Sequence, residues 1–249
     1  MDERQGRRFH RARTGAGAGR RPTWLGGVEG LRHVDPNAAS EKSKVRFARR
    51  GGGVQKKLSD AVTEETAKHP ERSVEVFASD EHRLGLKPVT RRVWAPIGER
   101  PIAPGHHRFD WLYVTAFVSP ASGETFWYVH DGVSKPFFEA LLKTFAREAG
   151  AGLHRTIVLV LDNAGWHGEA GLNIPEGVRL VFLPPYTPEL QPAETLWALV
   201  DEPIVNKHVE TIHELDEIIG KRCGALANER DVIKSRAGFH WWPKIANAN

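Results

Sequence analysis

Three acidic residues stand out because of the segments that precede them. Asp80 follows the β-branched and aromatic run Ser73–Ala78, and Asp162 follows the continuous apolar run Thr156–Leu161. Glu194 opens a segment with helical spacing, directly after a loop that contains four prolines. Mg²⁺ prefers oxygen ligands such as carboxylates. Two such ions, about 3.5–4 Å apart, can stabilise the attacking and leaving oxygens of a displacement at phosphorus. If the three acids converge, they predict metal-dependent phosphodiester chemistry.

Each acid also has an ordinary structural interpretation. An Asp at the end of a strand can cap a helix, and a Glu in the first helical turn complements the helix dipole. Ligands of open α/β sheets nevertheless gather beyond the carboxyl ends of strands, where Asp162 is expected. Side chains alternate along a strand, so Asp80 and Glu81 should point to opposite faces. We therefore expect only one of them to join Asp162, and the other to be solvated or structural.

The hydrophobic pattern predicts a mixed α/β sheet with helices packed against it. The expected strands cover 73–78, 90–94, 111–118, 124–129, 156–161 and 178–183, and the expected helices cover 57–68, 137–149, 193–200 and 211–222. In this scheme Asp80 closes a strand, Asp162 ends the most buried strand, and Glu194 lies in the first turn of an amphipathic helix. Five residues with the composition of a hairpin loop, 119–123, join the strands on either side of them.

Composition narrows the class of protein. Hydrophobic residues make up 40% and charged residues 27% of the 249 residues, as in ordinary globular proteins. The single cysteine, Cys223, excludes an internal disulfide and a cysteine-cluster zinc site. No apolar run approaches the roughly 18 residues that span a bilayer, and the N-terminus lacks the apolar stretch of a secretory signal. We expect a soluble, intracellular protein that does not enter membranes.

Charge is unevenly distributed along the chain. Residues 1–57 contain 15 Lys and Arg against 5 Asp and Glu, whereas the remainder contains 20 against 26. A basic arm on an acidic body suggests attraction to nucleic acid, and a solvated tail is the alternative. Gly51–Gly53 has the composition of a flexible joint. The predicted organisation is a flexible, disordered Gly/Arg-rich arm over 1–57, a catalytic domain over 58–222 and a C-terminal tail over 223–249.

Two blocks of sequence, the first two of the following five, are highly specific, and three others accompany them. They are Leu161-Asp162-Asn163-Ala164-Gly165-Trp166-His167, Leu183-Pro184-Pro185-Tyr186-Thr187-Pro188-Glu189-Leu190-Gln191-Pro192-Ala193-Glu194-Thr195-Leu196-Trp197, Asp80-Glu81-His82-Arg83-Leu84-Gly85-Leu86, Arg92-Val93-Trp94-Ala95-Pro96-Ile97-Gly98-Glu99-Arg100-Pro101 and Gly238-Phe239-His240-Trp241. On these residues the chain resembles the IS630 family of bacterial insertion-sequence transposases. That family belongs to the Tc1/mariner group and the DDE endonuclease superfamily. The resemblance runs from about Val74 to Trp242.

The resemblance implies an RNase H-like fold in which Asp80, Asp162 and Glu194 form a metal-binding catalytic triad. It implies DNA transposition, that is, recombination and integration: hydrolysis at the element's ends, then attack of the freed 3′-hydroxyl on target DNA. The implied cofactor is Mg²⁺, with Mn²⁺ as substitute. The implied partners are double-stranded DNA, at the element ends and the target, and further copies of the chain in a homo-oligomeric active complex. The implied location is the bacterial cytoplasm, associated with DNA.

Residues around the triad suggest supporting roles. Asn163 and His167 could orient Asp162 or contact phosphate, and a plain structural role for His167 is equally open. Four cations could line a DNA path, because Lys and Arg supply most backbone contacts, or could form a solvated face: Arg83, Lys87, Arg91 and Arg92.

Three further features involve tryptophan. We expect Trp94 and Trp197 to be core residues rather than platforms for base stacking. The apolar pair Trp241-Trp242 near the C-terminus is expected to dock on the body of the protein or on another subunit.

The chain departs from the family at its N-terminus. Full-length relatives begin with helix-turn-helix modules, and residues 1–57 lack their helical periodicity. One explanation is a separately encoded helix-turn-helix subunit. The alternative is a truncated, non-catalytic remnant that binds DNA or a partner transposase. A nuclease that acts on RNA–DNA hybrids is a third alternative with the same fold.

Overall fold

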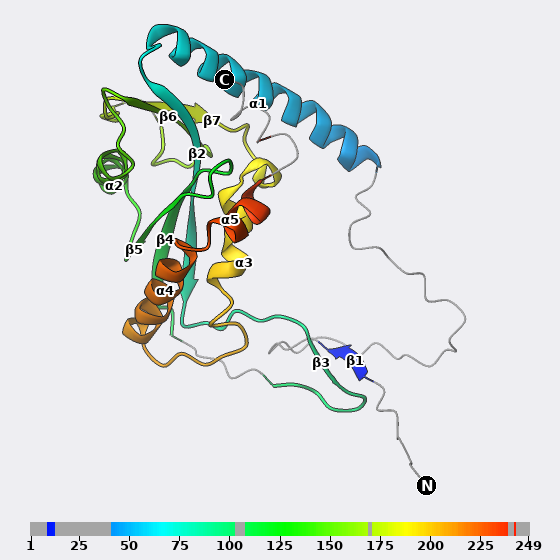
Figure 1. Ribbon diagram of the computed structural model, residues 1–249. Helices are drawn as coiled ribbons and strands as arrows, with labels where there is room; N and C mark the ends of the chain where they lie inside the picture. Colours follow the sequence, from blue (N-terminus) through cyan, green and yellow to red (C-terminus); the bar gives the residue numbers. More distant parts are fainter. Residues whose placement is uncertain (1–8, 13–40, 103–107, 169–170, 239–241, 243–249) are drawn as a thin grey trace.

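The sheet at the centre of the molecule has five strands in the order β5-β4-β2-β6-β7 (Figure 1). The computed structural model describes residues 9–12, 41–102, 108–168, 171–238 and 242, with the backbone alone for 9–12 and 41–51. The strands are β2 (Ser73–Gly85), β4 (Trp111–Val118), β5 (Thr125–His130), β6 (Arg155–Leu161) and β7 (Val178–Phe182). The pairs β5–β4 and β4–β2 are antiparallel, whereas the pairs β2–β6 and β6–β7 are parallel. The mixed sheet predicted from sequence is confirmed.

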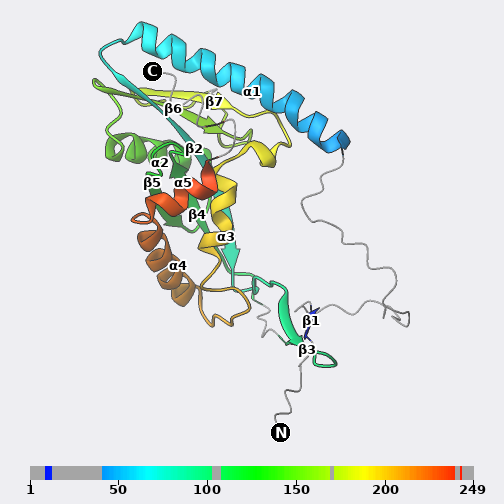
Figure 2. The same cartoon turned by 45° about the vertical axis from the view of Figure 1, so that its right-hand side comes forward.

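Helices cover both faces of the sheet, and the alternation of side chains divides the core accordingly. One face packs on α2 (Lys135–Glu148) through Phe77, Ile157 and Leu159. The other face, through Val76, Val158 and Val160, packs on α1 (Glu41–Lys68), α4 (Ile212–Leu226) and α5 (Arg230–Ala237). Figures 1 and 2 show α2 on one side of the sheet and α4 and α5 on the other.

Strand β2 is longer than the sequence pattern indicated. It continues to Gly85, so Asp80 lies inside the strand rather than at its end. Pairing with β6 stops at Ala78 and Val160, but antiparallel pairing with β4 continues from Ala78 to Gly85. The polar run after Ala78 therefore stays extended because β4 still supplies hydrogen-bond partners on one side. The prediction that Asp80 closes a strand is wrong, because β2 continues for five residues beyond it.

Helix α1 (Glu41–Lys68) begins 16 residues before the helix expected from the sequence. The predicted boundary between residues 57 and 58 falls inside it, and Gly51–Gly53 is helical rather than a flexible joint. The buried side chains of Val54 and Leu58 hold this part of the helix on the sheet, across β2, β6 and β7. Low helix propensity of glycine is a weak preference that such packing overrides. Residues 1–8 and 13–40 of the predicted arm lie outside the described residues.

The C-terminal part belongs to the body of the protein. Helix α4, capped by Thr211, runs past the predicted boundary at residue 222. Helix α5 then buries Ile233 and Ala237 in the same core as Trp242, which is 1% exposed. Docking of this tail on the body is confirmed for Trp242, whereas Trp241 lies outside the described residues.

Two elements near the site differ from the predicted helix over 193–200. A 3₁₀ helix η2 (Ala193–Leu196) leads into a single turn of α-helix, α3 (Trp197–Val200). The apolar stripe is nonetheless buried as expected, because Ala193, Leu196, Trp197 and Val200 all belong to the core.

A short antiparallel pair lies apart from the main sheet. Strand β3 (Val93–Pro96) replaces the strand expected over 90–94 and pairs with β1 (Phe9–Ala12) (Figure 1). Trp94 is 70% exposed, so the prediction of a core role for it is wrong. None of the helices in the described part of the chain combines the length and apolar composition needed to cross a bilayer.

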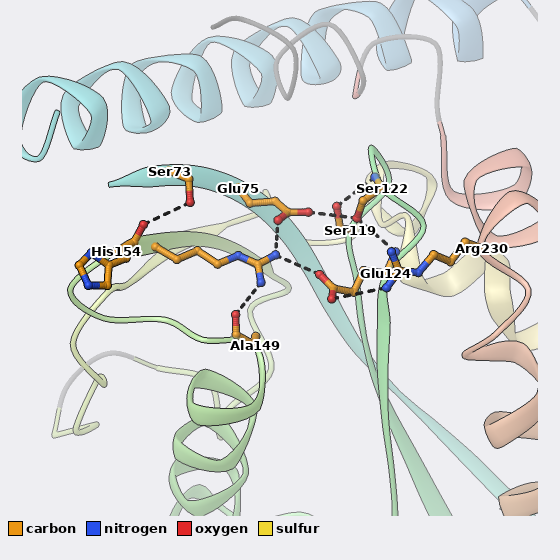
Figure 3. Close-up of polar contacts among 9 residues, drawn as sticks. Ser73, Glu75, Ser119, Ser122, Glu124, Ala149, His154 and Arg230 are labelled. Atoms are coloured by element: carbon orange, nitrogen blue, oxygen red, sulfur yellow. Dashed lines mark hydrogen bonds and ion pairs between the residues drawn. The ribbon is translucent and has the colours of Figure 1, made fainter. Parts of the chain in front are cut away.

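A cluster of charges ties together the amino end of β6 and the β4–β5 hairpin. The Arg155 guanidinium contacts Glu75 on β2 and donates to Glu124 at 3.0 Å and to the Ala149 carbonyl at 2.6 Å. Glu75 also accepts a hydrogen bond from Ser122 in the hairpin loop (Figure 3). Asp162 follows the carboxyl end of β6, so this cluster lies at the opposite end of the strand from the predicted site.

Candidate active site

The three acids predicted to do chemistry line one cleft. The cleft has a volume of about 490 Å³, and its walls include Asp80, Asp162 and Glu194. The remaining lining residues are Asn163, Ala164, the proline-rich segment 183–188 and Gln191. The parallel register explains part of this convergence. The last β2–β6 pair is Ala78 with Val160, so Asp80 on β2 and Asp162 just after β6 each stand two residues beyond this pair.

Asp80 projects from the face of β2 that packs on η2 and α3. Its Oδ2 accepts a hydrogen bond from Trp197 Nε1 at 2.9 Å. Burial, reinforced by the charges of Glu81 and Asp162, raises the pKa of Asp80 to about 7, although the Trp197 hydrogen bond acts in the opposite direction. Trp197 is buried as predicted, but it also serves the site. Its ring stacks on His82, two residues beyond Asp80, at 5.0 Å.

Asp162 is oriented by donors from its own loop. Its Oδ1 accepts from the Ala164 N–H at 3.0 Å and from His167 Nδ1 at 2.7 Å. Burial by itself raises the pKa of Asp162. The hydrogen bonds from His167 and Ala164, together with the His167 charge, outweigh burial and lower that pKa. Asn163 donates to the Leu183 carbonyl, which ties the loop after β6 to the proline-rich segment.

His167 is completely buried and connects two carboxylates. Its Nε2 lies 3.0 Å from Glu81 Oε1, while its Nδ1 serves Asp162. Burial disfavours the charged imidazole, but the hydrogen bonds to Asp162 and Glu81 raise the pKa of His167 to about 9. Both ring nitrogens therefore donate near neutral pH. Of the two roles expected for Glu81, solvation is excluded, because its side chain is 8% exposed, and the hydrogen bond to His167 fits the structural one.

Glu194 lies on η2, and buried polar contacts hold this 3₁₀ turn in place. Gln191, which is 3% exposed, donates to the Ser79 carbonyl beside Asp80 and accepts from the Ala193 N–H. The Glu194 carboxylate itself is exposed at the cleft, and partial burial together with the charge of Glu189 raises its pKa. Sequence reasoning missed the role of Gln191. The sequence contained one indication of this role, because Gln191 is an amide side chain within the proline-rich loop that leads to Glu194.

Comparison with known proteins identifies the family of the chain. Residues 75–219, more than half of the chain, match the family described as DDE superfamily endonuclease. The chain belongs to the DDE superfamily of endonucleases. An uncharacterized protein of Sinorhizobium fredii (y4pE/y4sA) is 30% identical over 115 residues, which cover 46% of this chain and 82% of that protein.

The fold of this DDE endonuclease is also that of a solved transposase. The mariner Mos1 paired-end complex with Mg matches at a TM-score of 0.53 and 14% identity, over 89% of this chain. The DDE endonuclease spans 65% of that Mos1 chain. At this identity the likeness concerns the fold alone. It confirms the predicted RNase H-like arrangement of the sheet and helices, and family and fold agree with the DDE-type enzyme predicted from sequence.

The donor atoms of the cleft suit a divalent cation. The hydrogen bonds from Ala164 and His167 to Asp162 both go to Oδ1, so Oδ2 can serve a ligand, and Asp80 accepts from Trp197 through Oδ2. Hard cations take such oxygens together with water and phosphate oxygens. Within the described ranges, however, no three side chains of His, Cys, Asp or Glu are grouped closely enough to hold a metal ion. The exposed Glu194 side chain would have to turn toward the two aspartates.

The four cations predicted to contact DNA do not line the cleft. Arg83 is exposed, with its guanidinium 4.6 Å from the centre of the Trp111 ring, and Lys87 and Arg92 are also exposed. Arg91 donates to the Ala198 carbonyl at 2.8 Å, so it holds the segment that follows η2. Their role in DNA binding stays a prediction. Tyr186, in contrast, lines the cleft and is 94% exposed, with a positive φ of 58°.

Proposed function

We propose that this DDE endonuclease is the catalytic part of a DNA transposase of the IS630 type. It hydrolyses phosphodiesters at the ends of an element. The freed 3′-hydroxyl then attacks a phosphodiester of target DNA, joins to its phosphorus and displaces the 3′-oxygen of the target strand. The observation that carries the proposal is one cleft lined by Asp80, Asp162 and Glu194 within a domain of the DDE superfamily.

The three carboxylates are the proposed ligands of Mg²⁺, or of Mn²⁺ in its place. When bound, such ions stabilise charge on the attacking and leaving oxygens at phosphorus. Asp80 lies on β2 and Asp162 directly follows the neighbouring strand β6, while Glu194 approaches from η2 across the cleft. His167 holds Asp162 in position, and Gln191 holds η2 against β2. Tyr186 offers an aromatic face at the cleft wall, on which a nucleic-acid base can stack.

Double-stranded DNA, at the element ends and the target, is the proposed partner. The Mos1 protein that shares the fold was crystallised as a paired-end complex, which supports an active assembly of more than one copy. A surplus of cations in residues 1–57 supports salt-sensitive, non-specific binding to phosphates. Recognition of the element's ends is assigned to a separately encoded helix-turn-helix subunit. A cytoplasmic location in a bacterium follows from this role.

A second candidate function is a non-catalytic remnant that binds DNA or a partner transposase. The observation that favours it is the lack, within the described residues, of three ligand side chains already grouped for a metal. The two candidates differ in one property. The enzyme nicks DNA in a reaction that requires divalent metal and Asp162, whereas the remnant binds DNA without cutting it.

The deciding experiment supplies the full chain with Mg²⁺ or Mn²⁺ and duplex DNA that carries the element's flanking ends. Wild type is compared with Asp162→Asn and with Asp60→Asn, which removes an exposed carboxylate on α1 that does not line the cleft. We expect nicking by wild type and Asp60→Asn, and a loss of several orders of magnitude in Asp162→Asn. Equal nicking by wild type and Asp162→Asn would exclude Asp162 from the mechanism. Binding without nicking under either metal would support the remnant, and preference for RNA–DNA hybrids would reassign the substrate.

A further inference from the structure

We infer that Glu81 is a positioning residue of the metal site, acting on Asp162 through His167. This inference rests on the proposed metal-dependent function. In this arrangement, the consecutive residues Asp80 and Glu81 both contribute to one metal site, and they do so from opposite faces of the sheet. Asp80 contributes directly on the η2 face, and Glu81 contributes indirectly on the α2 face.

The contacts form a continuous path. Glu81 Oε1 lies 3.0 Å from His167 Nε2, and His167 Nδ1 lies 2.7 Å from Asp162 Oδ1. Each ring nitrogen is held by one carboxylate, so the imidazole cannot rotate without losing both hydrogen bonds. The ring also packs on Phe138 of α2, with 4.4 Å between the ring centroids. The path from Glu81 to Asp162 is therefore rigid.

The burial of these groups argues for a specific role. His167 is completely buried and the Glu81 side chain is 8% exposed, whereas Asp162 remains 49% exposed at the cleft. Removing polar groups from water is costly unless each finds a partner. The buried residues His167 and Glu81 are therefore partners for each other and for Asp162, whose carboxylate is the only one of these three groups that stays open to a ligand. With Oδ1 of Asp162 held by His167 and by the Ala164 N–H, the position of Oδ2 is determined.

Outer carboxylates of this kind orient the groups that bind metals, and their loss typically lowers metal affinity about 10- to 100-fold. The matched control is Glu75, which lies on the same strand and the same face but contacts Arg155 at the far end of β6. Replacing Glu75 perturbs the sheet without touching His167. A purely structural role for Glu81 would make the two replacements equivalent.

The test measures Mn²⁺ affinity of the full chain by electron paramagnetic resonance of free Mn²⁺, alongside thermal unfolding. The variants are Asp162→Asn, Glu81→Gln, Glu81→Asp and Glu75→Gln. We expect Asp162→Asn to lose Mn²⁺ binding and Glu81→Gln to weaken it about tenfold or more. Glu81→Asp keeps the charge but is too short to reach His167, so it should weaken binding as well. Glu75→Gln should leave affinity unchanged even where it lowers the unfolding temperature.

A double replacement tests whether Glu81 acts on Asp162 through His167 or lowers Mn²⁺ affinity by a general effect on the fold. In a His167→Asn background, Glu81→Gln should cause no further loss of Mn²⁺ affinity, because its connection to Asp162 is already broken. If both Glu81 variants keep their Mn²⁺ affinity while Asp162→Asn loses Mn²⁺ binding, the inference about Glu81 is overturned and the proposed function stands. Unchanged affinity in Asp162→Asn would instead overturn the metal site itself.

Discussion

Replacing Asp80 with Asn should stabilise the protein while abolishing its activity. Asp80 is largely buried beside Glu81 and Asp162, and burial is the main reason that its pKa rises from 3.8 to about 7. Asn has nearly the same shape, and its carbonyl oxygen can still accept the hydrogen bond from Trp197 Nε1. The substitution therefore removes an unfavourable buried charge and retains the local packing.

The magnitude follows from the two pKa values. The folded protein binds the Asp80 proton more tightly than the unfolded chain, in which the pKa is 3.8. Stability therefore falls as the pH rises from about 4 to about 7, and it is constant above that range. Each pH unit between the two values corresponds to about 1.4 kcal/mol. At pH 8 the ionised carboxylate thus lowers the free energy of unfolding by up to about 4 kcal/mol, and near pH 4 by almost nothing.

The assay is urea unfolding of wild type and Asp80→Asn between pH 4 and pH 8, with EDTA present and Asp60→Asn as the control. We expect the difference in unfolding free energy to grow with pH for Asp80→Asn and to stay near zero for Asp60→Asn. A constant difference across this range, or a less stable Asp80→Asn protein at pH 8, would refute the reasoning. Addition of Mg²⁺ should stabilise wild type selectively, because binding to the folded state alone raises stability.

Two other substitutions test the supports of the fold and the site. Arg155→Met leaves Glu75 and Glu124 facing each other with side chains only about a quarter exposed, so urea unfolding should show a loss of about 2 kcal/mol. A loss near zero would mean that solvent already screens the cluster. Trp197→Phe removes the donor to Asp80 and should raise the pKa of that carboxyl further. Nicking at pH 7 should fall by up to about tenfold, with partial recovery at pH 9; equal loss at both pH values would contradict this account.

Much of the architecture could be predicted from local patterns. The apolar run Thr156–Leu161 indicated a strand buried on both faces, and β6 is the strand between β2 and β7. The hairpin of β4 and β5 and the helix α2 lie within two residues of their expected bounds. These predictions succeed because strands and amphipathic helices repeat with periods that the order of side chains records directly.

The extent of several elements depended on partners distant in sequence. The polar stretch 79–85 is a strand only because β4 pairs with it, and Gly51–Gly53 is helical only within a helix held on the sheet by Val54 and Leu58. Local propensity measures what a segment favours alone. Tertiary packing decided the outcome where that preference was weak.

For the candidate site, too, part was determined by the sequence and part by the tertiary structure. The sequence by itself determined which acids to consider, because Asp162 and Glu194 stand in the two distinctive blocks by which the chain resembles a transposase family. Only the tertiary structure decided that Asp80, Asp162 and Glu194 line one cleft, and that Glu81 reaches Asp162 through His167. The physical reason is that hydrogen bonds and burial depend on distances across the sheet, and Glu81 and His167 are 86 positions apart in the chain. No local pattern records such a distance.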